Sequence, residues 1–250
     1  MGMSNATLDS SADSLQRAAD EVRREHFNGN EKGFAELVRE CLYNGVTLDD
    51  SLLPNRLLIS LGALMMGSRR GSVKRVVTFN FDSVLESYIS IYGFVPRVVL
   101  QPPVDEGPED VRIYHPHGFL PHPALGADSS DFVILGLKSI NLRLGKRNDD
   151  WIEMLRHVLT TGIGLFIGLS EHSFRDRALA PLLADVAETL KRRRPTGFWV
   201  LVSEPGDRDQ LTKEFLDLGV VPLHLSTYEE VPKFLLNVCQ RSAGSIRVSG

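Results

Sequence analysis

Residues 75–82 read RVVTFNFD, a short apolar and β-branched run that is followed at once by polar side chains. The run Arg75–Phe79 fits a short buried strand. Residues 81–92 then carry apolar side chains at helical spacing. The stretch therefore predicts a strand followed directly by a helix, with Asn80 and Asp82 where the strand ends and the helix begins.

The same alternation continues along the rest of the chain. Strands that are apolar along their length and alternate with helices are typical of a parallel sheet covered on both faces. From about residue 72 onward the sequence predicts an α/β fold, a Rossmann-like doubly wound parallel sheet. We expect the further strands at Val95–Leu100, Val111–Tyr114, Phe132–Leu135, Gly164–Ile167, Gly197–Val202 and Val220–Leu225, and further helices at Trp151–Leu159, Ala178–Arg193, Leu211–Leu218 and Val231–Cys239.

The N-terminal part is helical in character. Apolar residues at three-to-four spacing predict a helix over Asp13–Tyr43, broken at Asn28-Gly29-Asn30, and a third helix capped by Asp49-Asp50-Ser51. We therefore expect a small helical module over residues 1–71, a Rossmann-type domain over residues 72–240 and a flexible tail over residues 241–250.

Composition narrows the class of protein. Hydrophobic residues make up 42% and charged residues 24%, as in ordinary globular proteins, and the net charge of -4 disfavours a primary nucleic-acid binder. The two cysteines cannot build a four-cysteine zinc site. The sequence carries neither a signal peptide nor an apolar run of membrane-spanning length, so we expect a cytoplasmic protein without membrane contact.

Small or polar residues follow four of the expected strands. They are Thr78–Asp82, His115–Gly118, Gly168–Ser170 and Ser203-Glu204. Ligands of open parallel sheets bind outside the carboxyl ends of the strands, so these residues predict a site at one rim. Taken singly, Asn80 and Asp82 are also suitable caps for the next helix.

The histidines allow a metal site as an alternative. The pair His115 and His117 has a common metal-ligand spacing, and Asp82, His122 or His172 could complete the site of a metal-dependent hydrolase.

Three motifs in this order resemble the sirtuin-like (SIR2-like) domains. Residues 78–82 are similar to the family's Thr-x-Asn-x-Asp motif, residues 115–118 to its His-Gly motif, and residues 168–170 to its Gly-x-Ser strand end. The resemblance covers roughly residues 30–240 and is closest to the bacterial branch that degrades NAD in phage defence. It implies that Asn80 orders the nicotinamide ribose and a water and that His117 is the general base. It further places Thr78 and Asp82 at the nicotinamide end, Gly168 and Ser170 near the ribose and phosphate, and Ser203 near the adenosine end.

Two departures from the family pattern define the alternatives. The four-cysteine zinc module of the deacylases is missing, which argues against protein deacetylation and against a zinc cofactor. The Gly-rich strand and loop that cradles the NAD phosphates is also missing, since residues 1–13 contain only Gly2. We therefore expect an NAD-cleaving hydrolase, acting as a homo-oligomer or with a defence partner, with a non-catalytic nucleotide-binding or scaffold module as the alternative.

Overall fold

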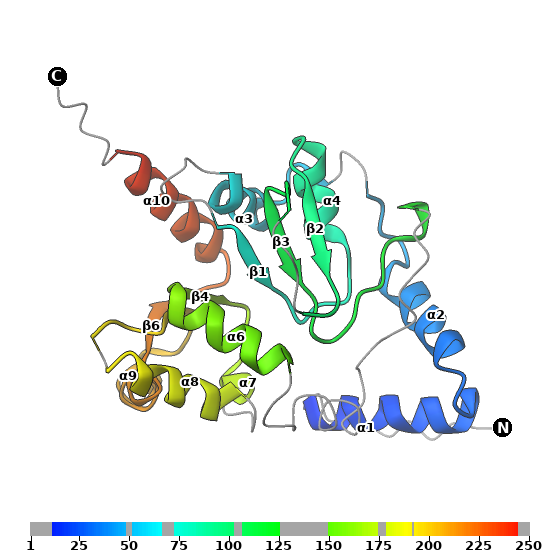
Figure 1. Cartoon of the computed structure of the whole chain (residues 1–250), viewed down its shortest axis with the longest axis horizontal. Coiled ribbons are helices and arrows are strands. Elements are labelled where there is room, and N and C mark those ends of the chain that lie inside the picture. Colours follow the sequence, from blue (N-terminus) through cyan, green and yellow to red (C-terminus); the bar gives the residue numbers. More distant parts are fainter. Residues whose placement is uncertain are drawn as a thin grey trace.

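The computed structural model describes residues 12–48, 52–66, 73–102, 107–125, 150–174, 179–191 and 193–244. Helices and parallel strands alternate along the second part of the chain, after a helical N-terminal part (Figure 1). The elements are α1 Ala12–Val22, the π-helical turn η1 Arg23–Phe27, α2 Glu31–Leu42, α3 Arg56–Met66, β1 Arg75–Val77, α4 Val84–Ile91, β2 Pro96–Val99, β3 Val111–Tyr114, the 3-10 turn η3 Pro123–Leu125, α6 Asp150–Thr161, β4 Gly164–Ile167, α7 Glu171–Phe174, α8 Leu179–Thr189, β5 Gly197–Val202, the 3-10 turn η4 Pro205–Asp207, α9 Arg208–Asp217, β6 Val220–Leu225 and α10 Glu230–Gly244.

The strands form two three-stranded sheets, in which every strand pair is parallel. The first sheet has the order β1-β3-β2 and the second the order β4-β5-β6. The expected Rossmann-like α/β fold is thus confirmed. Within the described residues, however, no strand pairing joins β1 to β4 into one continuous sheet.

Helices cover both faces of both sheets. Side chains of successive strand residues point to opposite faces, so neighbouring residues pack against different helices. Val76 packs with residues of α3 and α4, whereas Val77 packs with Trp151 of α6. In the second sheet Trp199 faces the core formed with α6, α8 and α9, and the next residue, Val200, faces α10. This two-sided burial explains why the strands are apolar along their length.

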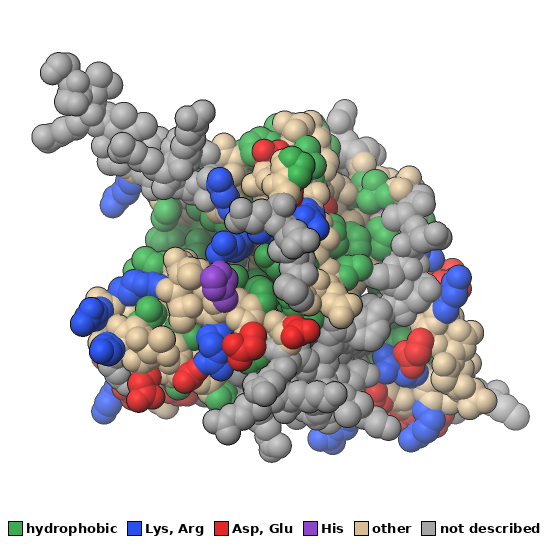
Figure 2. All heavy atoms as spheres, in the orientation of Figure 1, with side chains coloured by type: hydrophobic (Ala, Val, Ile, Leu, Met, Phe, Trp, Pro, Cys, Tyr) green, Lys and Arg blue, Asp and Glu red, His purple; other side chains and the backbone are tan. Residues whose placement is uncertain are grey.

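The inner edges of the two sheets, β1 and β4, share the same covering helices. Leu61 of α3 packs against both sheets on one face, and α6 does so on the other. These edge strands are more exposed than the central strands β3 and β5, and Leu165 of β4 keeps 37% of its surface accessible. Figure 2 shows hydrophobic side chains gathered between α10 and α6, where Figure 1 places these edges.

Some predicted boundaries differ for local reasons. Helix α3 begins at Arg56 because the Asn55 side chain accepts hydrogen bonds from the backbone N–H of Leu57 and Leu58. The predicted cap at residues 49–51 and the predicted strand Phe132–Leu135 lie outside the described residues. Helix α4 begins at Val84 rather than Phe81, since Asp82 accepts a hydrogen bond from the Val84 N–H at 3.0 Å.

Candidate active site

The loops that follow β1 and β3 are bound to each other by hydrogen bonds. The Thr78 N–H donates to the Tyr114 carbonyl at 3.0 Å, and the Leu120 N–H donates to the Phe81 carbonyl at 2.7 Å. Because β1 and β3 are parallel neighbours, their carboxyl ends lie at one edge of the sheet. The structure therefore brings the predicted motif residues 78–82 and 115–118 together.

Asn80 presents an exposed side chain from a backbone that is held on both sides. Its N–H donates to Thr78 Oγ1 at 3.1 Å, and its carbonyl lies 3.0 Å from His115 Nδ1. The side chains of Thr78 and Asp82 therefore both accept hydrogen bonds from backbone N–H groups of this turn. Thr78 accepts from Asn80, and Asp82 accepts from Val84.

His117 lies half-buried beside the same turn. Its ring packs against the ring of Phe79, with the centroids 4.8 Å apart. The chain then turns at Gly118, whose φ of 106° is a conformation that favours glycine, and the Gly118 N–H donates to the His115 carbonyl at 3.1 Å. The imidazole of His117 and the carboxamide of Asn80 thus come from two loops that pack together.

Beneath these loops lies a buried pair that the sequence did not reveal. His115 Nε2 lies 2.7 Å from Glu86 Oε1, and both side chains are almost completely inaccessible. Glu86 lies in the first turn of α4, and its position in the sequence gave no signal of a buried polar partner.

The metal alternative finds no support in these contacts. Both ring nitrogens of His115 lie within hydrogen-bond distance of protein oxygens, and those of His122 lie near the Val46 carbonyl and the Ala124 N–H. Across the part of the chain that the structure describes, no three His, Cys, Asp or Glu side chains are grouped to hold a metal ion. The side chain of His172 lies outside that part.

Tyr43, at the end of α2, connects the N-terminal helices by hydrogen bonds to the two loops that follow β1 and β3. Its buried hydroxyl accepts a hydrogen bond from the Ser83 N–H at 2.7 Å and donates one to the Leu120 carbonyl at 2.6 Å. Burial raises the pKa of Tyr43 above its ordinary value, which keeps the phenol protonated and able to donate. No local sequence pattern marked this residue, because its partners lie about 40 and 77 positions away.

The remaining predicted site residues follow strands of the second sheet. Gly168 follows β4 with a φ of 72°, and the next carbonyl, of Leu169, accepts a hydrogen bond from Trp199 Nε1 at 3.1 Å. Ser170 directly precedes α7 and is exposed. Ser203 follows β5, and its hydroxyl lies 2.7 Å from His224 Nδ1.

A family model described as the SIR2-like domain matches residues 74–223, more than half of the chain. The chain belongs to the SIR2-like domain family. The matched segment contains all the candidate site residues named above, from Thr78 to Ser203. A comparison with curated proteins gave no match.

Membership gives the chain an NAD-related function, since SIR2-like domains use NAD.

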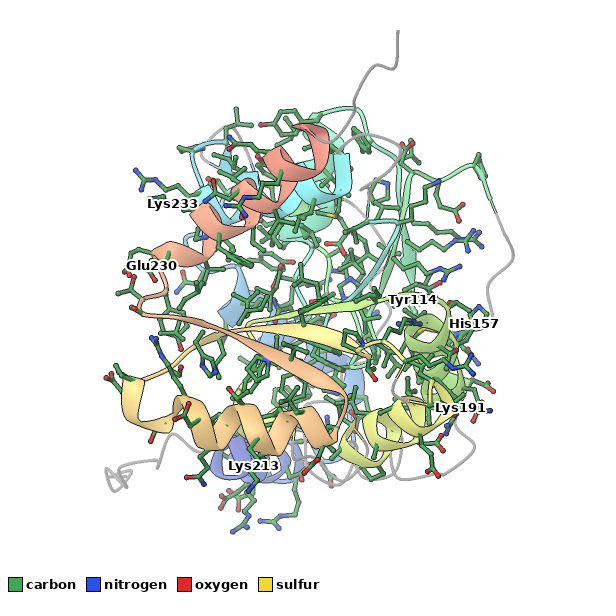
Figure 3. The ribbon with its side chains drawn as sticks, turned by 90° about the vertical axis from the view of Figure 1, so that its left-hand side faces the viewer. Tyr114, His157, Lys191, Lys213, Glu230 and Lys233 are labelled. Carbon is green, nitrogen blue, oxygen red and sulfur yellow. The ribbon has the colours of Figure 1, made fainter. Side chains whose placement is uncertain are left out.

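Figure 3 shows the end of the first sheet and the helix beside it. Tyr114, at the end of β3, lies next to α6, the helix that carries His157. Among the described residues, no helix has both the length and the apolar character needed to cross a membrane.

Proposed function

We propose that this SIR2-like chain hydrolyses the bond between nicotinamide and ribose in NAD. The observation that supports the proposal most directly is the packing of the Asn80 turn against the loop of His117, through the contact of Phe79 with His117 and that of Asn80 with His115. These are two of the three motifs that carry the resemblance to the NAD-degrading branch.

The chemistry needs few groups. As the glycosidic bond breaks, its electron pair leaves with nicotinamide and the ribose carbon becomes cationic. A water oxygen then adds to that carbon, and the proton of the water passes to His117, giving nicotinamide and ADP-ribose. Histidine suits this role because its ordinary pKa of about 6.5 lies near neutral pH. The Asn80 amide both donates and accepts hydrogen bonds without adding charge, and in our proposal it orients the ribose and the water.

The test is nicotinamide release by the purified protein. We expect His117→Ala to lower kcat about 10²- to 10⁴-fold, the usual contribution of a general base. Asn80→Ala should lower kcat about 10²-fold, as the loss of one preorganised hydrogen-bonding group does. The exposed residues His157 and Asn237 provide matched controls, because their alanine variants remove the same side chains far along the chain from the motifs. Equal rates for all four variants would refute the assignment.

A non-catalytic nucleotide-binding or scaffold module is the second candidate. The same protein samples decide between the two functions. A ligand that binds only the folded state raises the melting temperature. A rise with ADP-ribose but no nicotinamide release would identify a binding module, and no rise would favour a scaffold.

We also propose that NAD cleavage serves anti-phage defence, in a homo-oligomer or with a partner protein. The support is the resemblance of the three motifs to the phage-defence branch. Cells that express the chain should survive phage better than cells that express His117→Ala. Equal survival at equal protein levels would contradict the defence role without affecting the proposed chemistry.

A further inference from the structure

Asn80 owes its position to hydrogen bonds at both of its backbone polar groups. Thr78 Oγ1 accepts from the N–H, and the carbonyl faces His115 Nδ1 at 3.0 Å. The side chain itself is exposed, whereas His115 is only 1% exposed. A buried ring therefore holds the backbone from which an exposed carboxamide projects.

The hydrogen-bond partners of His115 define where its protons lie. A carbonyl oxygen can only accept, so Nδ1 carries a proton and donates it to Asn80. At Nε2, one further proton lies on the line to Glu86 Oε1, either on the ring or on the carboxyl group. The pair is neutral overall in both arrangements, which suits its burial because an uncompensated buried charge is costly.

The ring is also fixed by packing. The ring of Phe119 lies edge-on to the His115 ring, with the centroids 4.7 Å apart. Glu86 is carried by α4, which also packs against the first sheet through Tyr88 and Ile89. Two rigid elements, α4 and β3, therefore determine where the Asn80 carbonyl sits.

We infer that His115 is a positioning residue for Asn80 and that Glu86 holds the His115 ring for this task. The inference rests on the proposed NAD cleavage and extends it to two buried residues that lie behind the motif loops. Their effect on the reaction passes through the Asn80 backbone.

The test uses two substitutions of similar size. In His115→Asn the amide nitrogen takes the place of Nδ1, so the bond to Asn80 is kept and the contact with Glu86 is lost. In His115→Gln the amide nitrogen reaches toward the place of Nε2, so Glu86 keeps a partner and Asn80 loses its own. Activity and stability should therefore respond in opposite ways.

We expect His115→Gln to lower kcat for nicotinamide release about 10²-fold with little change in KM, since small misplacement of a reacting group has effects of that size. His115→Asn should stay within about tenfold of the wild-type kcat, by the same reasoning. The melting temperature of His115→Asn should be lower than that of His115→Gln, because His115→Asn leaves Glu86 buried without its partner. Loss of kcat in proportion to loss of stability, or equal kcat in both variants, would overturn the inference.

A second readout does not depend on the reaction. In protein labelled with ¹⁵N-histidine, the signal that disappears in His115→Asn belongs to His115. We expect its Nδ1 to carry a slowly exchanging proton, in the wild type and also in Glu86→Gln, whose amide donates to Nε2. An Nδ1 without a proton would overturn the inference. If the wild type releases no nicotinamide but Nδ1 is protonated, the proposed function fails and the contact with Asn80 stands.

Discussion

His224 lies on β6 with a hydroxyl group at each of its ring nitrogens. Ser203 Oγ is 2.7 Å from Nδ1, and Thr212 Oγ1 is 2.9 Å from Nε2. Burial, with the nearby Arg208 as a second cause, lowers the pKa of His224 below its ordinary value. The neutral ring accepts a hydrogen bond at one nitrogen and donates at the other, which fits two hydroxyl partners. Ser203 is thereby fixed at the carboxyl end of β5.

The lowered pKa of His224 predicts a loss of stability in acid. Below about pH 6.5 the unfolded chain takes up a proton on this ring that the folded state resists, so the free energy of unfolding falls as pH falls through the pKa of the folded state. Urea unfolding between pH 5 and 8 measures this dependence. The stability advantage of the wild type over His224→Phe should be full above pH 7 and should shrink toward pH 5. A difference that is constant across this range would contradict the prediction, and the exposed His157→Ala is the control.

Helix α2 contacts the two motif loops at more than one point. Besides the hydrogen bonds of Tyr43, Ala35 packs in a cluster with Leu120, which follows the His-Gly motif, and with Phe81 from the Asn80 turn. Helix α2 and Tyr43 thus contact two loops that follow different strands and hold them next to each other.

Tyr43→Phe should destabilise the protein by about 1–3 kcal/mol, the usual cost of leaving a buried polar group without its partner. The Ser83 N–H and the Leu120 carbonyl both lose the Tyr43 hydroxyl, and the ring itself is retained. Denaturant unfolding measures the change. Tyr228, whose surface is 77% exposed, supplies the matched control as Tyr228→Phe. Equal stability of the two variants would show that the hydroxyl of Tyr43 does not hold the loops.

The whole molecule is joined across its two sheets by shared helices. Leu61 of α3 packs against the cluster of the first sheet and against that of the second. Trp151 reports on the first sheet and Trp199 on the second, because each lies in the core of one of them. Since no strand pairing joins β1 to β4 within the described residues, helix packing is what couples the halves there.

We expect both sheets to unfold in one transition. The variants Trp151→Phe and Trp199→Phe each keep a single tryptophan, whose fluorescence reports on one sheet. In each variant, the unfolding midpoint from tryptophan fluorescence should match the midpoint from circular dichroism. Leu61→Ala should lower the midpoint by an amount equivalent to about 2 kcal/mol, at the lower end for a leucine truncation because this side chain is only partly buried. Leu216→Ala, at a side chain that is 45% exposed, should lower the midpoint much less. Fluorescence midpoints that separate from those of circular dichroism would show that the sheets unfold independently.

The sequence alone determined the order and type of the longer described elements, but not the short helical segments η3, α7 and η4. Strands β3, β4, β5 and β6 have the predicted bounds, because each is mostly apolar and is followed by glycine or a polar residue. It also placed the Asn80 and His117 motifs directly after two strands of one sheet. These features depend on residues close together in the chain, where periodicity and turn residues carry the signal.

Only the tertiary structure decided how the strands divide into two sheets and what lies behind the motif residues. Glu86 meets His115 across 29 positions, and Tyr43 meets Leu120 across 77. Such pairs leave no local pattern, because a buried hydrogen bond depends on where two distant segments pack and not on the residues next to either one.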